Sequence, residues 1–320
     1  MKPIIPPVDR DMLLQELDNE KFLRKTNNGD NMLYVITHRD SPNVMQEIGR
    51  LRELTFRAAG GGTGKEIDID EFDIMSEPYK QIVVWDPTRK EILGGYRYFV
   101  CSDNICFEGD HCNLASGELF SFSERFREEY MPYMIELGRS FVQPAYQTTN
   151  RRSKGLYALD NLWDGLGAIW MTHKHVKYFF GKVTMYTQYD VEARDLILYF
   201  MDKYFGDREN LLVPIEPLQL KTDRKVLESI LCGSNYQEDY KLLSQNVRAR
   251  GENIPPLINA YMNLSPTMRS FGTALNPTFG GVEETAIMVT LEDIYVEKYE
   301  RHIKSYKPKD QLLDDLFMER

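Results

Sequence analysis

The chain has 320 residues, of which 42% are apolar and 28% charged, a balance typical of a globular protein with a sizeable core. Its net charge of −10 argues against a general nucleic-acid binder, because phosphate contacts need a basic face. No apolar run approaches the roughly 18 residues of a membrane span, and the start MKPIIPPVDR lacks the apolar core of a signal peptide. We therefore expect a soluble, cytoplasmic protein with at most peripheral contact with the inner membrane.

The patterns along the chain predict strands and helices that alternate irregularly. The first helix follows a proline-containing arm and has Leu13, Leu14 and Leu17 on one side. The later elements are expected to be a strand at 31–38, a helix at 43–59, a β-hairpin at 81–100, a strand at 134–144, a helix at 156–175, a strand at 179–187, a helix at 190–205, a short helix at 254–264 and a strand at 284–294. This order predicts an α/β (α+β) fold with a mixed sheet, and not the regular βαβ alternation of a nucleotide-binding fold.

Composition also suggests where the chain divides. Residues 1–30 form the arm and first helix, and residues 31–205 carry most of the predicted strands, so we expect the catalytic core there. Residues 206–250 are polar and charged with few strand signals, which is typical of an insertion or flap. Residues 251–320 then complete the core and end in a terminal helix.

A glycine-rich segment, GGGTGK at 60–65, invites comparison with a phosphate-binding P-loop. A P-loop has Ser or Thr after its Lys to bind magnesium and follows a strand, whereas Glu66 follows Lys65 here and the segment follows a predicted helix. We therefore predict a flexible loop that covers the substrate.

A zinc site is suggested by Cys101, Cys106, Cys112 and His111, which lie close together in the sequence. Structural zinc ligands are usually paired about two to four residues apart, and this spacing does not fit. We predict reduced thiols and no metal.

The segment EIDIDEFD at 66–73 is rich in carboxylates. One interpretation is a solvated acidic turn. Because its apolar residues should turn inward, some carboxylates would be buried as well, and a buried charge needs a partner. The candidate partners are Arg52, Arg57 and Arg97.

Glu136 and Arg139 stand in an otherwise apolar strand, IELGRSFV. In a regular strand Glu136 and Gly138 would share one face and Leu137 and Arg139 the other. A Glu among buried residues is costly unless it is paired or functional. The sequence leaves two interpretations open, a catalytic carboxylate and a structural ion pair.

The basic segment RRSKG at 151–155 directly precedes a predicted helix. Backbone N–H groups at a helix start attract anions, so a phosphate could bind here. A solvated basic loop is the alternative interpretation.

Four blocks in order, LRELTFRAA, DIDEFD, GGYRYF and ELGRSFVQPAYQ, resemble a known family. They are similar to the ornithine acyl-carrier-protein N-acyltransferases, often labelled hemolysin-like, of the GNAT superfamily, and to the acyl-homoserine-lactone synthases. Within that family, the likeness is greatest to the amino-acid N-acyltransferases that make glycine-type lipids. It extends over residues 33–200 and resumes at 254–294. The glycine-rich loop and the length of the 206–250 segment depart from the family pattern.

The resemblance implies a GNAT fold with splayed central strands and a site built on these motif positions: Arg52, Phe56, Asp70, Asp73, Arg97, Glu136 and Arg139. Glu136 would be the base that takes a proton from the amine, while Arg97 and Arg139 would hold carboxylates, those of Asp70 and Asp73 or that of the acceptor. The N–H groups beside Phe141 and Val142 would hold the thioester carbonyl. The donor phosphate and the carrier protein would meet a basic segment comprising Arg151, Arg152, Lys154 and Gly155.

The implied reaction moves a fatty acyl or 3-hydroxyacyl group from acyl carrier protein, or from acyl-coenzyme A, to the amine of a small amino acid such as glycine or ornithine. The product would enter aminolipid synthesis and meet an O-acyltransferase next. One alternative is an acetyl-coenzyme-A-dependent acetyltransferase for small molecules. The other is a membrane-active hemolysin-like protein, against which the missing signal peptide and lytic segment argue.

Overall fold

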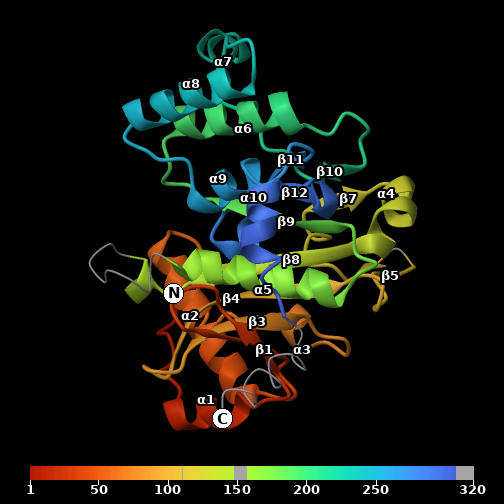
Figure 1. The fold of residues 1–320 in the computed structure, drawn as a ribbon. Coiled ribbons are helices and arrows are strands. Elements are labelled where there is room, and N and C mark those ends of the chain that lie inside the picture. The colour runs from red at the N-terminus through yellow and green to blue at the C-terminus, as the bar shows by residue number, and fades with distance from the viewer. Residues whose placement is uncertain (110, 148–156, 308–320) are drawn as a thin grey trace. The chain divides into compact units, whose positions relative to one another are not determined.

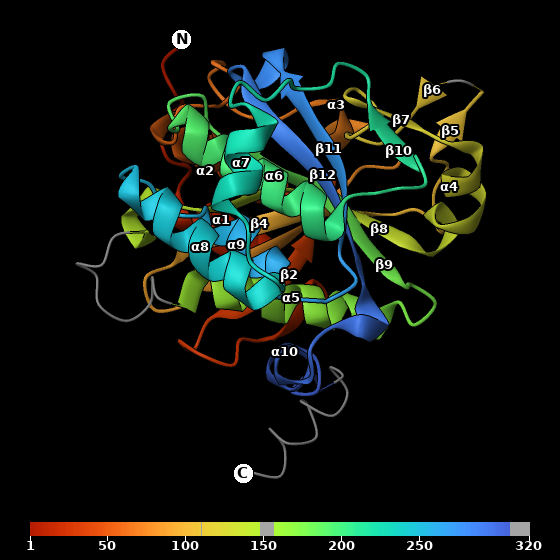
Figure 2. The ribbon, with the colours of Figure 1, turned by 90° about the horizontal axis from the view of Figure 1, so that it is seen from above.

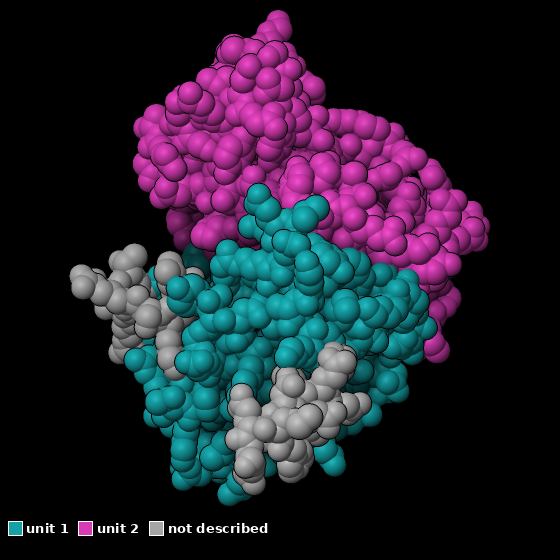
Figure 3. Space-filling model, viewed as in Figure 1, with its two compact units in different colours: residues 1–104, 135–176, 296–320 teal, residues 105–134, 177–295 magenta. Residues whose placement is uncertain are grey.

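The computed structural model describes residues 1–109, 111–147 and 157–307, and the chain divides into two compact units (Figure 3). Unit 1 comprises residues 1–104, 135–176 and 296–320, and unit 2 comprises residues 105–134 and 177–295. Each unit has strands and helices of its own (Figure 1). The domain bounds expected from composition stay a prediction.

Unit 1 carries the N-terminal elements, the strand around Glu136 and the last helix. Its elements are α1 Arg10–Glu16, β1 Phe22–Lys25, β2 Met32–Ile36, α2 Pro42–Ala58, α3 Glu71–Ile74, β3 Lys80–Asp86, β4 Glu91–Val100, β8 Met134–Val142, the 3-10 turn η2 Pro144–Tyr146, α5 Ala158–Thr172 and α10 Val296–His302. The strand, helix and hairpin expected between residues 31 and 100 are all present, and so are the strand at 134–144 and the helix that follows it.

The sheet of unit 1 has helices on both faces. Its strands lie in the order β1–β2–β3–β4–β8, and neighbours run antiparallel. Ile82 of β3 faces α5, where a Cβ added to Gly165 would lie 2.9 Å from the Ile82 side chain. The preceding residue, Gln81, points to the other face of the sheet, where it accepts a hydrogen bond from Arg52 of α2. Because successive strand residues face opposite sides, α5 covers one face and α2 the other (Figure 1).

A β-bulge interrupts the pairing of β4 with β8. Between the pairs Gly95–Phe141 and Arg97–Gly138, β4 contributes one residue and β8 contributes two. One of those two, Arg139, has a φ of 49°, in the left-handed region that residues other than glycine rarely adopt. The alternation of side chains along β8 therefore changes at this point.

Unit 2 is built around a second set of strands. Its elements are β5 Phe107–Glu108, β6 His111–Cys112, β7 Phe120–Phe122, α4 Glu124–Glu129, η1 Met131–Tyr133, β9 Tyr178–Met185, α6 Val191–Phe205, β10 Leu212–Pro214, α7 Arg224–Ile230, α8 Tyr236–Ala249, α9 Pro256–Met262, β11 Arg269–Asn276, η4 Pro277–Phe279, β12 Val282–Thr290 and η5 Leu291–Asp293. Strands β9, β12 and β11 pair antiparallel in that order. β10 pairs with β7 and β5 with β6.

The segment expected to be an insertion or flap, 206–250, contains β10, α7 and α8. Helix α8 lies beside α6 (Figure 2), where Phe200 and Tyr204 contact Tyr236 across the helix pair. The buried carboxylate of Asp239 accepts a hydrogen bond from Lys203 at 2.6 Å. The segment is thus folded against α6 by an aromatic cluster and an ion pair.

The helices of the described residues include none with both the length and the apolar character that a membrane crossing needs. The first helix differs from expectation in one respect. Leu13 and Leu17 are buried, but Leu14 is 44% exposed, because α1 packs through a narrower stripe than the three leucines suggested.

Candidate active site

The aspartates of the DIDEFD motif define a one-turn helix, α3. Asp70 is its N-cap and accepts a hydrogen bond from the N–H of Asp73, while the Asp73 carboxylate accepts one from the N–H of Asp70. This reciprocal capping box satisfies N–H groups that a helix start leaves without partners. It also fixes both carboxylates in place beside β3 and β4.

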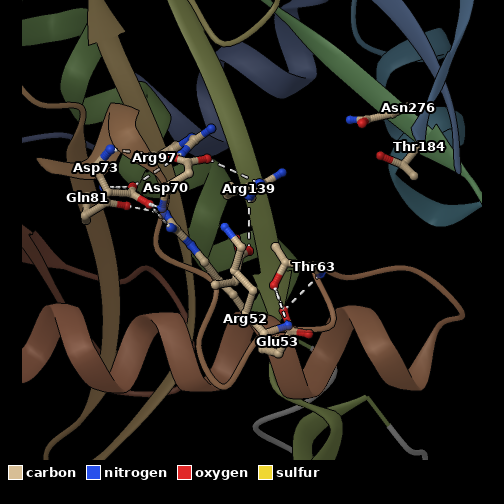
Figure 4. A network of polar contacts seen from close by, with 12 residues as sticks. Arg52, Glu53, Thr63, Asp70, Asp73, Gln81, Arg97, Arg139, Thr184 and Asn276 are labelled. Carbon is tan, nitrogen blue, oxygen red and sulfur yellow. Dashed lines mark hydrogen bonds and ion pairs between the residues drawn. The ribbon is translucent and has the colours of Figure 1, made fainter. Parts of the chain in front are cut away.

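From α3 a chain of charged side chains, here called the charge row, runs across the sheet face that α2 covers (Figure 4). Its members are, in order of contact, Arg52, Asp73, Arg97, Asp70, Arg139 and Asp68. Arg52 Nη1 donates to Asp73 Oδ2 at 2.9 Å, and Arg52 Nη2 donates to Gln81 Oε1 at 2.6 Å. Gln81 closes the triangle by donating to Asp73 Oδ1 at 3.0 Å. This end of the row is buried.

Arg97 and Arg139 continue the row on either side of Asp70. Arg97 Nη1 donates to Asp70 Oδ1 at 2.6 Å, and Arg139 Nη2 donates to Asp70 Oδ2 at 3.2 Å. Arg139 Nε lies 3.1 Å from Oδ2 of the fully buried Asp68. Positive and negative groups alternate along the row, which is how buried charges are stabilised.

Asp70 and Asp68 have opposite pKa shifts although only Ile69 separates them. Burial would raise the pKa of Asp70, but Arg97 and Arg139 outweigh burial and hold that pKa well below its usual range. Burial raises the pKa of Asp68, and the attraction of Arg139 offsets it only in part. Among the described residues, the Asp68 oxygens accept no hydrogen bond, so the ion pair with Arg139 stabilises this charge without hydrogen bonds to support it.

The β-bulge decides where Arg139 points. In a regular strand Arg139 would share a face with Leu137, as the sequence predicted. The structure instead brings Arg139 to the carboxylate that Arg97 also binds, because the extra residue in β8 reverses the alternation. Gly138 lies opposite Arg97 and leaves space for the Arg97 side chain, since a Cβ at Gly138 would lie 3.4 Å from Arg97 Nε. The prediction of the face was wrong for this residue.

Glu136 is 2% exposed and lies on the same sheet face, opposite Phe99. Its Oε2 accepts a hydrogen bond from the hydroxyl of Tyr79, which is completely buried. Arg139 pairs with Asp68 and Asp70 of the charge row. The two interpretations of Glu136 left open by the sequence, a catalytic carboxylate and a structural ion pair, both stay predictions.

The glycine-rich loop is hydrogen-bonded to α2. Glu53, which is fully buried, accepts hydrogen bonds from Thr63 N and Oγ1 (Figure 4). It also accepts one from Gly64 N and pairs with Arg57. Burial would raise the pKa of Glu53, but the bonds from Thr63 and Arg57 lower it. One helix carboxylate thus binds several of the loop's donors, and the flexible loop that covers the substrate stays a prediction.

The residues expected to receive the acyl donor divide into two sets. Phe141 and Val142 end strand β8, next to the bulge. Arg151, Arg152, Lys154 and Gly155 lie outside the described residues. In the described part of the chain, no group of His, Cys, Asp and Glu side chains is arranged to hold a metal ion.

Three contributors to the site were missed by sequence reasoning. Gln81 had a signal, since a polar residue within the apolar run QIVVWD is unusual unless it is bonded. Glu53 had a weaker one, its spacing of four residues from Arg57 on a helix. Tyr79 had none, because a tyrosine before a strand is ordinary. Phe56, expected at the site, is buried one turn after Arg52 on α2.

Known proteins share both the motif region and most of the chain. The acetyltransferase (GNAT) domain family matches residues 51–155, the stretch that contains the charge row and Glu136. The glycine N(alpha)-acyltransferase of Phocaeicola vulgatus is 56% identical over 308 residues, which cover 96% of this chain and 94% of that protein. That of Bacteroides thetaiotaomicron is 54% identical over 306 residues, covering 96% and 91%.

Among solved structures, the AHL synthase LasI aligns with a TM-score of 0.33 and 13% identity, over 49% of this chain and 74% of that one. So distant a likeness adds nothing to the assignment. The domain match and the two relatives suffice, and they confirm the GNAT fold class expected from the sequence. The chain therefore belongs to the same family as these two acyltransferases and is an N-acyltransferase built on a GNAT domain.

Proposed function

We propose that this enzyme transfers a fatty acyl or 3-hydroxyacyl group from acyl carrier protein to the amine of glycine, in the synthesis of an aminolipid. The observation that carries the proposal is 56% identity to a glycine N(alpha)-acyltransferase along nearly the whole length of both chains. We further propose that it acts in the cytoplasm or at the inner face of the membrane. Its N-acyl product has one chain, so an O-acyltransferase would be needed to add a second.

The reaction forms a C–N bond and breaks a C–S bond. The neutral amine attacks the thioester carbonyl carbon, the amine loses a proton, and the thiol of the phosphopantetheine arm leaves. An amino acid's amine is mostly protonated at neutral pH, so a base must accept a proton. Glu136 is the candidate, and because it is 2% exposed it would act through a water molecule that reaches the carboxylate.

The hydrogen bonding of β8 supports a role for Val142 at the thioester carbonyl. Gln143 N donates to Leu93 O at 2.9 Å, which makes these two residues a hydrogen-bonded pair. Such pairs alternate with non-hydrogen-bonded pairs in an antiparallel ladder, and the next pair is Gly94–Val142. The Val142 N–H therefore points away from β4, while that of Phe141 points toward it. We assign the carbonyl contact to Val142.

Exposure separates the members of the charge row by role. The side chains of Arg52, Asp73 and Arg97 are at most 3% exposed, so they shape the site from within. Asp70 and Arg139 are 22% and 16% exposed. These two are the members that a substrate would touch, Asp70 through its carboxylate and Arg139 through its guanidinium.

The test of the reaction uses the purified full chain with 3-hydroxypalmitoyl carrier protein, palmitoyl-coenzyme A or acetyl-coenzyme A as donors. Glycine, ornithine and serine are the acceptors, and mass spectrometry detects the N-acyl products. We expect N-acylglycine as the main product with the carrier-protein donor and strong loss of turnover in Glu136→Gln. Turnover with acetyl-coenzyme A alone would overturn the lipid proposal and support a small-molecule acetyltransferase. Leakage of lipid vesicles caused by the protein alone would support the hemolysin-like alternative.

The basic segment offers a separate test of the carrier protein as partner. Charge reversal at Arg151, Arg152 and Lys154 should raise KM for the acyl carrier protein donor, because these cations would meet the acidic carrier. The KM for the same acyl group on coenzyme A should change less. An equal rise for both donors would assign the segment to the shared phosphate instead, and no change for either would remove it from the donor site.

A further inference from the structure

Tyr79 lies at the junction of the elements that build the site. Its side chain is completely buried just before β3, and its hydroxyl donates a hydrogen bond to Oε2 of Glu136. Its backbone N–H donates to Phe72 O at 2.9 Å, and its carbonyl accepts from Gln81 Nε2 at 3.1 Å. The residue is thus tied to α3, to β3 and to the proposed base on β8.

The ring of Tyr79 is fixed as firmly as its backbone. It stacks on Phe99 with ring centroids 4.7 Å apart and an interplanar angle of 26°, and it meets Phe72 edge-on at 5.8 Å. The guanidinium carbon of Arg97 lies 5.1 Å from the ring centroid, within the range of a cation–π contact. Tyr79 therefore contacts Arg97 of the charge row through its ring and Glu136, the proposed base, through its hydroxyl.

A phenol that donates to a carboxylate has two effects on it. It fixes the orientation of the carboxylate, and it stabilises the ionised form, which is the form that accepts a proton. Because Tyr79 is itself held by stacking and by backbone bonds, it can impose this orientation on Glu136 without moving. Packing alone would not require the hydroxyl, since the stacked ring of a phenylalanine would fill the same space.

We propose that Tyr79 is a positioning residue that holds Glu136 in its proton-accepting orientation and links it to the charge row through Arg97. This inference rests on the proposed role of Glu136 as the base. It assigns to the reaction a side chain outside the four sequence blocks that carry the family resemblance.

The experiment compares Tyr79→Phe with Tyr98→Phe and Glu136→Gln. Tyr98 is the matched control. It is also buried, but on β4 it faces the side opposite to Arg97 and Phe99, away from Tyr79 and Glu136. We expect Tyr79→Phe to lower kcat by roughly tenfold or more, as loss of a hydrogen bond to a charged group would, with little change in KM for glycine. The acid limb of its kcat/KM profile should move to higher pH, because the ionised carboxylate loses a donor. Tyr98→Phe should leave both unchanged.

A second substitution should shift the acid limb of the pH profile in the opposite direction. Replacement of Tyr79 by 3-fluorotyrosine makes the phenol a stronger donor at nearly the same size, so the acid limb should move to lower pH. If Tyr79→Phe matches Tyr98→Phe in kcat and pH profile while Glu136→Gln is inactive, the positioning role is wrong and the base proposal stands. If Glu136→Gln keeps wild-type turnover, the base proposal itself fails, and this inference fails with it.

Discussion

The carboxylate of Asp70 is shared by two arginines, with Arg97 Nη1 at 2.6 Å from Oδ1 and Arg139 Nη2 at 3.2 Å from Oδ2. This sharing lowers the pKa of Asp70, because both guanidinium groups favour the ionised form. A carboxyl with a lowered pKa in the folded state stabilises the fold above its unfolded pKa of about 3.9, and that contribution is lost as the pH falls toward the folded value.

Asp70→Asn should therefore lower the free energy of unfolding by about 2 to 3 kcal/mol at pH 7, since it leaves two arginines with one partner fewer. The deficit relative to wild type should shrink below about pH 4, where wild-type Asp70 begins to lose its advantage. Urea unfolding at pH 7 and at acidic pH measures both effects.

Asp68→Asn is the matched comparison. Because burial raises the pKa of Asp68, its ionised form opposes folding above the folded pKa and ceases to do so as the pH falls. We expect this substitution to cost clearly less at pH 7 than Asp70→Asn. Equal losses for the two variants would contradict the opposite pKa shifts assigned to them.

Gly94 illustrates how closely β4 and β8 approach near the bulge. A Cβ at Gly94 would lie 2.4 Å from the carbonyl oxygen of Phe141 and 3.3 Å from Val142 Cα, both backbone atoms that cannot move freely. Gly94→Ala should lower the free energy of unfolding by about 1 to 3 kcal/mol, as overpacking does, and should reduce turnover by displacing Val142.

Gly138→Ala provides the control for that variant. A Cβ there would meet only the Arg97 side chain at 3.4 Å, an ordinary contact, so its loss of stability in denaturant unfolding should be smaller. If both alanine variants unfold alike, the close approach at Gly94 is not the cause of the loss.

Much of unit 1 could be predicted from sequence, because its buried strands and helix α2 are apolar and periodic. Strand β11 was missed because Gly272, with a φ of 86°, interrupts a weak alternation where the register slips. Helix α8 was missed because it buries only a narrow stripe, Asp239, Leu243 and Val247, within a polar segment. Both failures occur where tertiary packing, and not local pattern, fixes the element.

The charged residues of the site could be predicted from their motif positions. The contacts they make were harder to predict, because those contacts depend on the backbone geometry. The aspartates and arginines of the row were candidates from the sequence, but the direction of Arg139 depends on a bulge that residue counting cannot reveal. The hydrogen bond from Tyr79 to Glu136 could not be found either, because Tyr79 lies just before β3, 57 positions away in the chain. Long-range contacts of this kind leave no mark on a single sequence.

Glu53 should control the glycine-rich loop. Glu53→Gln removes the ion pair with Arg57 and part of the acceptor capacity that binds Thr63 and Gly64, so the loop should open more often. We expect faster cleavage by trypsin after the exposed Lys65, followed by mass spectrometry of the fragments. Glu20→Gln, an exposed position, should leave the cleavage rate unchanged. An unchanged rate in Glu53→Gln would mean that other contacts hold the loop.

The last helix of unit 1, α10, should depend on one buried carboxylate of α5. Asp164 Oδ1 lies 2.8 Å from His302 Nδ1, and the same carboxylate accepts bonds from the backbone and side-chain nitrogens of Asn27 at 2.8 Å. Asp164→Asn replaces an acceptor oxygen by a donor, so hydrogen exchange in α10 should rise by about tenfold, the effect of losing one to two kcal/mol of local stability.

Asp160→Asn is the control for α10, because it removes the ion pair of Asp160 with the exposed Arg301 and keeps the buried bond from Asp164 to His302. Asp160 itself approaches His302 Nε2 only to 4.0 Å. Exposed pairs contribute about 0 to 1 kcal/mol, so exchange in α10 should change little in this variant. If both variants raise exchange equally, the net charge on α5 and not the buried bond to His302 holds the helix. If neither does, α10 is held by its close backbone contact at Gly167, where an added Cβ would lie 2.4 Å from His302 O.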